Sequence, residues 1–402
     1  MVRRAMKVSA TPPGGPVYIK IPNNMLSKKR VRDKIYPKSR FTIPMDLVPD
    51  ESLVEKAARI LIEAKHPLIN VGGEVTRAGA NDDLIELAEL LSIPVAQGVS
   101  CYGDFPFKHQ LFAGFWTMGP YGYGLGIDTL LNLGTHMPDP GYVSNPVPPT
   151  CRVIHARIEY ENIANIYPTD VAIAAGIRET IRGIIEAVKA MLTKSRIDVV
   201  RAERLEKIMP GLAAPRKKRE EKARARWDAS PLSWERLSFE VDKELEEDAV
   251  IVPELTHRTP YYWMNFAKGK KRLVGRTTGS ALGWGLGASL GVKAGLPDKQ
   301  VVCLIGDGGL LFGQLESLWS FSRYDVPVII IILNNHSYEG PRQRMAMISR
   351  RSKEDYKDMA CYIGDPDVDF VSIANSFGIK GETVSRPSDI SPAMKRAVSA
   401  TR

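Results

Sequence analysis

A short motif near the C-terminal end of the chain carries the residue types that bind a magnesium diphosphate. Residues 306–309 read Gly-Asp-Gly-Gly, and 25 residues separate the Gly-Asp-Gly triplet from Asn334 and Asn335. Asp307 offers a carboxylate oxygen, and Mg2+ prefers one or two such protein oxygens together with phosphate oxygens and water. Glycine at three of these positions removes side chains where the backbone would approach a phosphate closely. The spacing therefore predicts a diphosphate site.

Two buried strands would position this motif. Residues 301–305 form a continuous apolar run, typical of a strand in a parallel sheet, and residues 326–333 form a second one. The segment 310–323 between them has the length and mixed polarity of a crossover helix. In such a βαβ unit both strands deliver their carboxyl ends to one edge of the sheet, where open α/β sheets bind ligands. Either half of the motif alone is ordinary turn chemistry, so the prediction depends on the combination.

Alternating apolar strands and amphipathic helices elsewhere predict an α/β fold with two parallel-sheet domains. The strand at 16–22 and the helix before it cannot form a core by themselves, so this strand is expected to pair with a sheet from elsewhere. Gly72, Gly73 and Gly79 lack the spacing of a dinucleotide-binding loop and are interpreted as helix–strand packing. The predicted helices are 2–10, 53–64, 82–91, 179–192 and 234–246, and the other predicted strands are 66–73, 93–96, 129–134, 152–156 and 249–253.

Composition limits the class of protein. With 402 residues, 44% hydrophobic and 25% charged, the chain is an ordinary globular protein with room for two or three domains. It has no apolar run of membrane-helix length, no signal-peptide core and only four scattered cysteines, so we expect a cytoplasmic protein without membrane contact. Much of the net charge of +9 sits at 28–32 and 216–219, without the interleaved aromatics of nucleic-acid-binding modules. No nucleic-acid partner is predicted.

The paired Gly-Asp-Gly and Asn-Asn motif resembles the diphosphate motif of thiamine-diphosphate enzymes. The order of the segments resembles the acetolactate synthase and benzoylformate decarboxylase group over essentially the whole chain. The resemblance implies an α/β fold with a pseudo-Rossmann middle domain and a thiamine-diphosphate-binding domain. Its segments are residues 1–24, the end of a pyrimidine-binding domain; 25–50, a linker; 51–192, the middle domain; 193–235, a second linker; and 236–402, the diphosphate-binding domain, ending before the family's closing strand.

The resemblance also implies roles for particular residues. Asp307 and Asn335 would bind Mg2+ through their side chains, and Ser337 through its backbone carbonyl. Leu282 matches the bulky apolar residue that holds the cofactor in its bent conformation, and the carbonyl of Ser280 would accept from the 4′-amino group. The remaining cofactor-binding residues are those lining the diphosphate, Gly306, Gly308 and Gly309, and those of a loop that also reaches it, Thr256 and His257.

The activity implied by the resemblance is decarboxylation of a 2-oxo acid, or ligation of the product to a second carbonyl, with thiamine diphosphate and Mg2+ as cofactors. An acetolactate-synthase-like enzyme is the first choice. An aromatic 2-oxo acid decarboxylase of the benzoylformate type is one alternative, and a non-catalytic assembly or regulatory subunit is another. Acetolactate synthases carry FAD on the middle domain, but no residue here requires it.

The family activates its cofactor with a glutamate of the pyrimidine-binding domain, most of which this sequence lacks. No glutamate present matches that role by motif, so the catalytic residues are left unassigned. The polypeptide alone is therefore expected to bind the cofactor weakly and to be inactive. The expected assembly is a homo-oligomer, or a hetero-oligomer with a chain that supplies a pyrimidine-binding domain.

Overall fold

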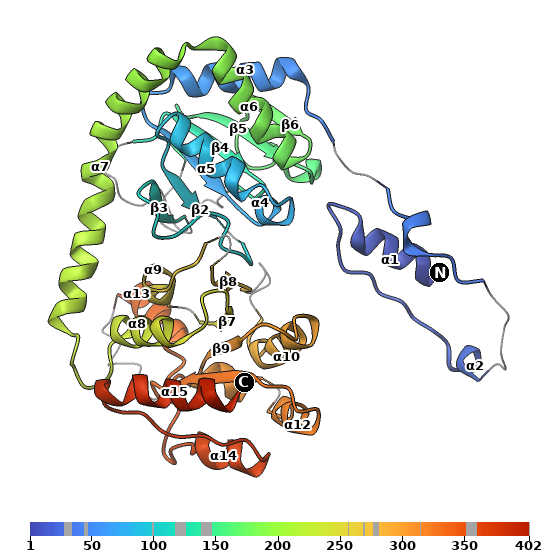
Figure 1. The fold of residues 1–402 in the computed structure, drawn as a ribbon, viewed down its shortest axis with the longest axis vertical. Coiled ribbons are helices and arrows are strands. Elements are labelled where there is room, and N and C mark those ends of the chain that lie inside the picture. The colour runs from blue at the N-terminus through green and yellow to red at the C-terminus, as the bar shows by residue number, and fades with distance from the viewer. Residues whose placement is uncertain are drawn as a thin grey trace.

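Two parallel sheets, each flanked by helices, form the two α/β domains that the sequence predicts (Figure 1). The upper domain in Figure 1 holds a six-stranded sheet, and the lower domain holds a four-stranded one. The computed structural model describes residues 1–27, 34–43, 47–98, 100–116, 126–137, 147–255, 257–267, 270–275, 281–313, 315–350 and 360–401.

The first sheet has the strand order β3-β2-β1-β4-β5-β6, and all of its strands are parallel. Sequence patterning missed β3, which contains Gly114 at a φ of +104°, and β6, whose small side chains alternate between buried and exposed. The strands are β1 (Pro67–Val71), β2 (Val95–Gln97), β3 (Phe112–Phe115), β4 (Thr129–Leu133), β5 (Arg152–Arg157) and β6 (Val171–Ala174), and the helices are α3 (Glu51–Glu63), α4 (Glu74–Arg77), α5 (Asn81–Leu90) and α6 (Ile177–Met191).

The second sheet has the order β10-β9-β7-β8 and is also parallel. The crossover expected at 310–323 is two short helices, because the chain breaks at Gly313, whose backbone packs against that of Gly283. The strands are β7 (Val250–Glu254), β8 (Arg272–Leu273), β9 (Val301–Gly306) and β10 (Ile329–Leu333), and the helices are α8 (Trp234–Glu244), α9 (Thr259–Trp263), α10 (Gly285–Gly295), α11 (Asp307–Phe312), α12 (Ser317–Arg323), α13 (Glu339–Ser349), α14 (Phe370–Ser376) and α15 (Ile390–Ala400).

One long helix, α7 (Lys194–Ala225), runs along both domains within the polar segment 193–235 (Figure 1). It buries apolar side chains on the body of the protein, and three arginines fix it there. Arg204 is 6% exposed and donates to the carbonyls at the ends of α3 and α5, burial lowering its pKa to about 10. Arg216 donates to three carbonyls around β3, and the Arg219 guanidinium lies 4.1 Å from the ring centroid of Tyr262 in α9. The polar segment 193–235 therefore contains a long helix that packs against both domains.

Aromatic side chains join the two domains. The ring of Phe107 lies 5.0 Å from that of Phe115 in the first domain and 6.1 and 5.8 Å from those of Tyr261 and Phe266 in the second. Such ring pairs stabilise an interface beyond the area they bury. The Gly275 amide also donates to the Cys101 carbonyl over 2.6 Å, so polar backbone contacts reinforce the aromatic ones.

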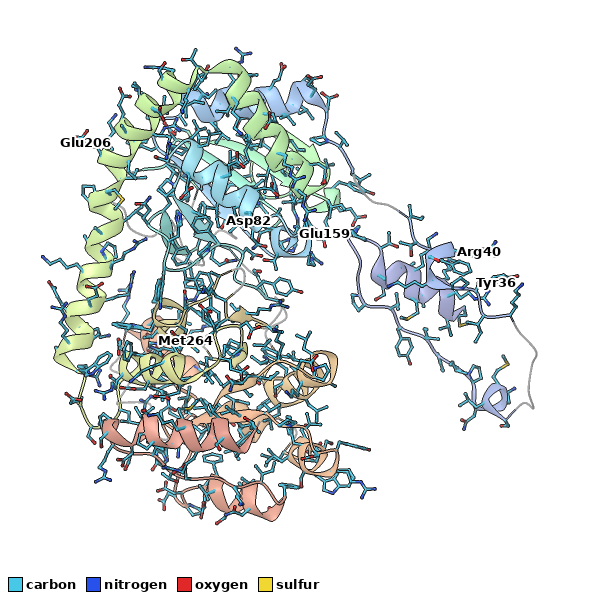
Figure 2. The ribbon with its side chains drawn as sticks, in the orientation of Figure 1. Tyr36, Arg40, Asp82, Glu159, Glu206 and Met264 are labelled. Atoms are coloured by element: carbon cyan, nitrogen blue, oxygen red, sulfur yellow. The ribbon has the colours of Figure 1, made fainter. Side chains whose placement is uncertain are left out.

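Most of the N-terminal segment projects from the two domains (Figure 1), and its turn touches α4 where Arg77 donates to the Pro13 carbonyl over 3.4 Å. Helix α1 (Val2–Ala10) forms where predicted but buries none of its residues. The strand predicted at 16–22 is absent, and Tyr18 is 89% exposed there. The physical reason is that a strand needs a neighbour for its backbone hydrogen bonds, and the described residues supply none. Figure 2 shows Tyr36 and Arg40 in this segment, where the Arg40 guanidinium lies 5.0 Å from the tyrosine ring centroid.

None of the helices in the described ranges has the length and apolar character needed to cross a membrane.

A row of buried polar side chains crosses the middle of the first sheet. Asn70 on β1 donates to Asn132 on β4 over 2.6 Å, and Asn132 donates to the Thr135 carbonyl. His155 on β5 is completely buried and lies 3.2 Å from the same carbonyl through its Nε2 atom. Burial lowers the pKa of His155 to about 4. The neutral ring is therefore a requirement of the folded state.

Acid is expected to destabilise the protein through His155. Its folded pKa lies below the unfolded value of 6.5, so the unfolded chain binds a proton that the folded chain does not as pH falls from 6.5 towards about 4. The stabilisation is complete above the unfolded pKa, and about 3 kcal/mol would be lost by pH 4. Urea denaturation between pH 7 and 4 measures this loss, and His155→Gln should flatten the slope. The same change at His336, whose side chain is 42% exposed, is the control, and equal slopes in all three proteins would contradict the prediction.

Candidate metal and diphosphate site

The predicted site residues lie at the carboxyl edge of the second sheet. In the register of the parallel strands, Leu333 of β10 pairs with Gly306 of β9, so Asn334 and Asp307 leave the sheet at the same level. Glu254, the last residue of β7, pairs with Ile305 on the other side of β9. The carboxyl ends of β7, β9 and β10 therefore lie side by side. Each of these apolar strands ends at, or is followed by, a polar residue.

Asp307 is at the centre of this edge and is 2% exposed. One carboxylate oxygen accepts from the Gly308 amide over 2.8 Å, and the other accepts from the Ser337 amide over 3.3 Å. The Ser337 amide also donates to Oδ1 of Asn335 over 3.1 Å. Burial raises the pKa of Asp307, and the surrounding backbone amides oppose that rise. The three residues predicted to bind the metal are therefore in contact with one another.

These residues fit a hard cation. Ser337 is 6% exposed, and its buried Oγ atom has no hydrogen-bond partner within the described ranges. The site offers one carboxylate, one side-chain amide oxygen and one backbone carbonyl. Such a small set of oxygen donors suits Mg2+, which keeps water and phosphate oxygens in its remaining positions. The described segments contain no cluster of three or more His, Cys, Asp or Glu side chains that would suit a different metal.

The three glycines of the motif have different surroundings. A Cβ atom at Gly308 would lie 2.5 Å from the Tyr338 ring, and one at Gly309 would lie 3.1 Å from Oε1 of Glu254. A side chain at either position would therefore collide with the protein. A Cβ at Gly306 would meet no atom of the described chain within 4 Å. Of the three, only Gly306 has open space in the direction of a Cβ atom.

Glu254 is a buried residue of this edge that sequence reasoning missed. It is 6% exposed, and its two carboxylate oxygens accept from the amides of Gly283 and Gly285, the latter over 2.6 Å. These amides lie at the turn into α10. The signal that would have found it is a carboxylate at the end of an otherwise apolar strand, because a buried charge requires partners nearby.

Comparisons with known proteins agree with this geometry. Residues 54–184 match the central domain of thiamine pyrophosphate enzymes, and residues 258–402 match their C-terminal TPP binding domain. The chain belongs to the thiamine pyrophosphate enzymes. The first match contains all six strands of the first sheet, and the second contains β8, β9 and β10 of the second sheet.

Relatives of this thiamine pyrophosphate enzyme include a probable acetolactate synthase large subunit from Methanococcus aeolicus, 24% identical over 98% of this chain and 67% of its own length. A benzoylformate decarboxylase from Pseudomonas aeruginosa is 25% identical over 99% of this chain and 71% of its own. The solved structure of a Rhodococcus jostii thiamine diphosphate-dependent 4-hydroxybenzoylformate decarboxylase superimposes with a TM-score of 0.76, at 25% identity over the whole chain and 71% of that protein. The chain spans about two thirds of the length of the curated relatives it matches.

Of the other residues predicted for this thiamine pyrophosphate enzyme, the structure describes His257 and Leu282. The His257 ring stacks on Trp234 at 4.8 Å and 6°, and its Nδ1 atom lies 2.9 Å from the Thr259 hydroxyl. Partial burial lowers the pKa of His257. Leu282 is 41% exposed beside the Gly283 turn, which leaves its side chain available for contact. Thr256 and Ser280 lie outside the described residues.

Gly72 and Gly79 lie against protein atoms, in agreement with their interpretation as packing residues. A Cβ at Gly72 would lie 2.4 Å from the Thr135 Cβ atom, and one at Gly79 would lie 2.5 Å from the Arg178 guanidinium. Protein atoms therefore occupy the space beside them.

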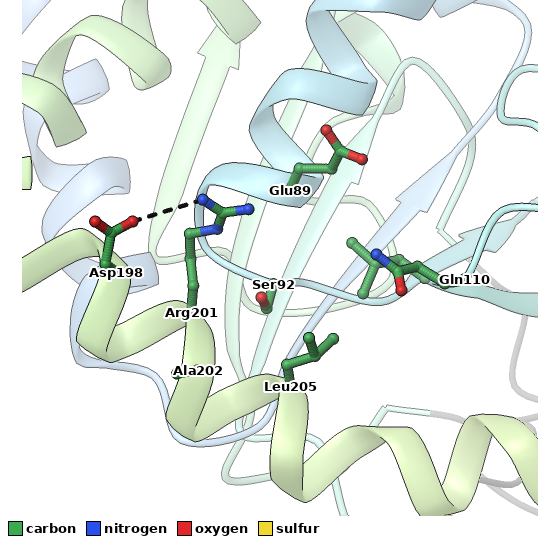
Figure 3. Close-up of a pocket in the computed structure, with 8 residues that line it drawn as sticks. Glu89, Ser92, Gln110, Asp198, Arg201, Ala202 and Leu205 are labelled. Carbon is green, nitrogen blue, oxygen red and sulfur yellow. Dashed lines mark ion pairs between the residues drawn. The ribbon is translucent and has the colours of Figure 1, made fainter.

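A cavity of about 260 Å3 lies between α5 and α7, on the first domain (Figure 3). Asp198 and Arg201 of α7 form a 3.6 Å ion pair at its wall, marked in Figure 3. Ser92, which is 4% exposed, lines the cavity from the end of α5. None of the predicted cofactor-binding residues of this thiamine pyrophosphate enzyme lines it, so it is separate from the carboxyl edge of β9 and β10.

Proposed function

We propose that this chain is the thiamine diphosphate- and Mg2+-binding portion of a 2-oxo acid decarboxylase or carboligase of the acetolactate synthase type. The observation that carries the proposal is the contact between Asp307, Asn335 and Ser337 at the ends of β9 and β10, within the matched TPP-binding domain. The similarity to acetolactate synthase large subunits supports the choice of activity.

In this proposal the residues of the chain hold the cofactor and the metal. The Asp307 carboxylate, the Asn335 amide oxygen and the Ser337 carbonyl bind Mg2+, and the backbone at Gly306, beside open space, lies along the diphosphate. Leu282, exposed at its turn, contacts the organic part of the cofactor. Thiamine diphosphate, when bound, supplies an electron sink for the loss of carbon dioxide from a 2-oxo acid.

We expect a pyrimidine-binding domain to complete the active site. None of the glutamates in this 402-residue sequence matches the pyrimidine-binding role by motif, so no residue here is assigned to cofactor activation. The polypeptide alone is expected to be inactive and to act in a homo- or hetero-oligomer with a pyrimidine-binding domain, in the cytoplasm. Measurable decarboxylation by the pure chain would contradict this part of the proposal.

An aromatic 2-oxo acid decarboxylase is the second candidate. It is favoured by the structural similarity to a 4-hydroxybenzoylformate decarboxylase over the whole chain. A product assay on the assembled enzyme separates the two candidates, because the first forms acetolactate from pyruvate and the second forms an aldehyde from an aryl-2-oxo acid.

The experiment that tests the proposal is calorimetric titration of the purified chain with thiamine diphosphate, with Mg2+ and then with a chelator. Binding that requires Mg2+ is the expected result. The same binding in chelator would sink the metal site. No binding, at millimolar cofactor and with a pyrimidine-domain chain present, would sink the proposal as a whole.

Gly306→Ala separates ligand contact from packing. The added methyl group meets no protein atom, so thermal stability should stay close to that of the wild type, whereas affinity for the magnesium complex of thiamine diphosphate should fall by about tenfold or more because the methyl occupies ligand space. Gly295→Ala, at the far end of α10, is the matched control, because its new methyl group also meets no atom. Equal affinities for both variants would show that Gly306 does not border the diphosphate.

A further inference from the structure

The Glu254 carboxylate joins three segments of the candidate site. It belongs to the end of β7, it accepts from the amides of Gly283 and Gly285, and its Oε1 atom lies beside Gly309 of the diphosphate motif. A Cβ atom at Gly309 would lie 3.1 Å from that oxygen, and one at Gly285 would lie 2.9 Å from Oε2. Glycine on both sides therefore allows this close approach.

The turn before α10 depends on Glu254 because the helix provides no cap of its own. Trp284, at the N-cap position of α10, makes no capping hydrogen bond with its side chain. The first amides of a helix need acceptors, and an anionic acceptor also interacts favourably with the helix dipole. Glu254, at the end of β7, supplies such an acceptor to the Gly285 amide.

The same turn also packs against the segment that follows the Gly-Asp-Gly-Gly motif. Gly283 has a φ of +80°, and a Cβ atom there would lie 2.2 Å from the Cα atom of Gly313, the residue that ends α11. Helix α11 begins at Asp307. The turn that carries Leu282 and the segment that carries Asp307 are thus held together from two sides, by Glu254 and by the contact between the two glycine backbones.

We propose that Glu254 is a positioning residue of the cofactor site. It fixes the turn that carries Leu282 relative to the segment that carries Asp307, so that one ligand can contact both at once. The inference rests on the proposed function, since the ligand is thiamine diphosphate. It assigns no proton transfer to Glu254, because both oxygens are occupied by backbone donors.

Glu254→Gln tests the inference with little change in side-chain shape. The glutamine has one acceptor oxygen, and its NH2 group faces the other backbone amide as a second donor. At least one of the Gly283 and Gly285 amides should therefore exchange its hydrogen about tenfold faster or more, while the amides of β9 keep their protection. Glu240→Gln is the matched control, because Glu240 is 7% exposed in the same domain and pairs with Arg236 on α8. Unchanged exchange at both glycine amides would overturn the link between Glu254 and the turn.

Ligand affinities provide the second readout. Inorganic pyrophosphate with Mg2+ contacts only the Asp307 segment, whereas thiamine diphosphate contacts both segments. Glu254→Gln should leave pyrophosphate affinity within about twofold and weaken thiamine diphosphate by about tenfold or more. Equal losses for the two ligands, or no loss for either, would overturn the positioning role. Failure of the wild-type chain to bind either ligand would instead sink the proposed function, and the exchange measurement would still decide whether Glu254 holds the turn.

Discussion

Asp307→Asn is expected to abolish magnesium-dependent binding of thiamine diphosphate and at the same time to stabilise the ligand-free protein. The neutral amide no longer attracts the cation, and losing a charged metal ligand should weaken binding by about 100-fold or more, beyond the loss typical of an outer-shell change. Burial raises the pKa of Asp307, so its ionised form opposes folding at neutral pH in the absence of metal. Removing the charge removes that cost, and this gain is expected to outweigh the loss of one of the two amide hydrogen bonds, because burial is the largest influence on the pKa of Asp307.

The pH dependence of thermal stability tests whether the Asp307 carboxylate destabilises the ligand-free protein. A raised folded pKa means that the contribution of Asp307 to stability is complete below its unfolded pKa and is lost as pH rises through the folded value. The stability advantage of Asp307→Asn should therefore be present at pH 7 and vanish in strong acid. Thermal melts with and without Mg2+ and thiamine diphosphate measure both effects, and Asp298→Asn at an exposed position is the control. A variant that still gains thermal stability from the magnesium cofactor would contradict the assignment of Asp307.

Arg157→Met is expected to destabilise the first domain by about 3–5 kcal/mol, the cost of leaving a buried charge without its partner. The side chains of Arg157 and Glu74 are each 4% exposed, and their charged groups lie 3.1 Å apart. Arg157 also pairs with Glu159 over 2.5 Å, a residue labelled in Figure 2. Without the guanidinium, the Glu74 carboxylate keeps the Ile158 amide as a donor but has lost its countercharge.

A second substitution isolates the charge effect from the loss of packing. In the double variant Arg157→Met with Glu74→Gln, the buried negative charge is gone, and the glutamine oxygen can still accept from the Ile158 amide. Urea denaturation should show the double variant about 1–2 kcal/mol more stable than Arg157→Met alone. A single variant as stable as the wild type would mean that the Glu74 carboxylate is solvated in the folded protein.

The strands around the site were predictable because they are continuous apolar runs, fully or nearly fully buried in β7 and β9 and partly buried in β10. The runs at 249–253, 301–305 and 326–333 have no polar residue to break the pattern, and they became β7, β9 and β10 in a parallel sheet. The contact between Asp307, Asn335 and Ser337 follows from the parallel register of β9 and β10. Short edge strands such as β6, with alternating burial of small residues, carry too little apolar signal to be read in this way.

Features that depend on tertiary contacts were beyond the sequence pattern. The packing of Tyr338 against Gly308 and of Glu254 against Gly309 could not be predicted from the spacing of the motif. The break between α11 and α12 depends on Gly283, 30 residues earlier. Helix α7 buries arginine head groups on distant backbone carbonyls, so its polar sequence looks like that of a solvated segment.

Helix α7 makes the two domains mechanically dependent on each other. Its first half is fixed to the ends of α3 and α5 through Arg204, and its second half is fixed near β3 and α9 through Arg216 and Arg219. A hinge rotation between the domains would have to break contacts along the whole helix at once. We therefore expect the two domains to unfold together, so that a ligand bound at the carboxyl edge of β9 also raises the resistance of the first domain to unfolding.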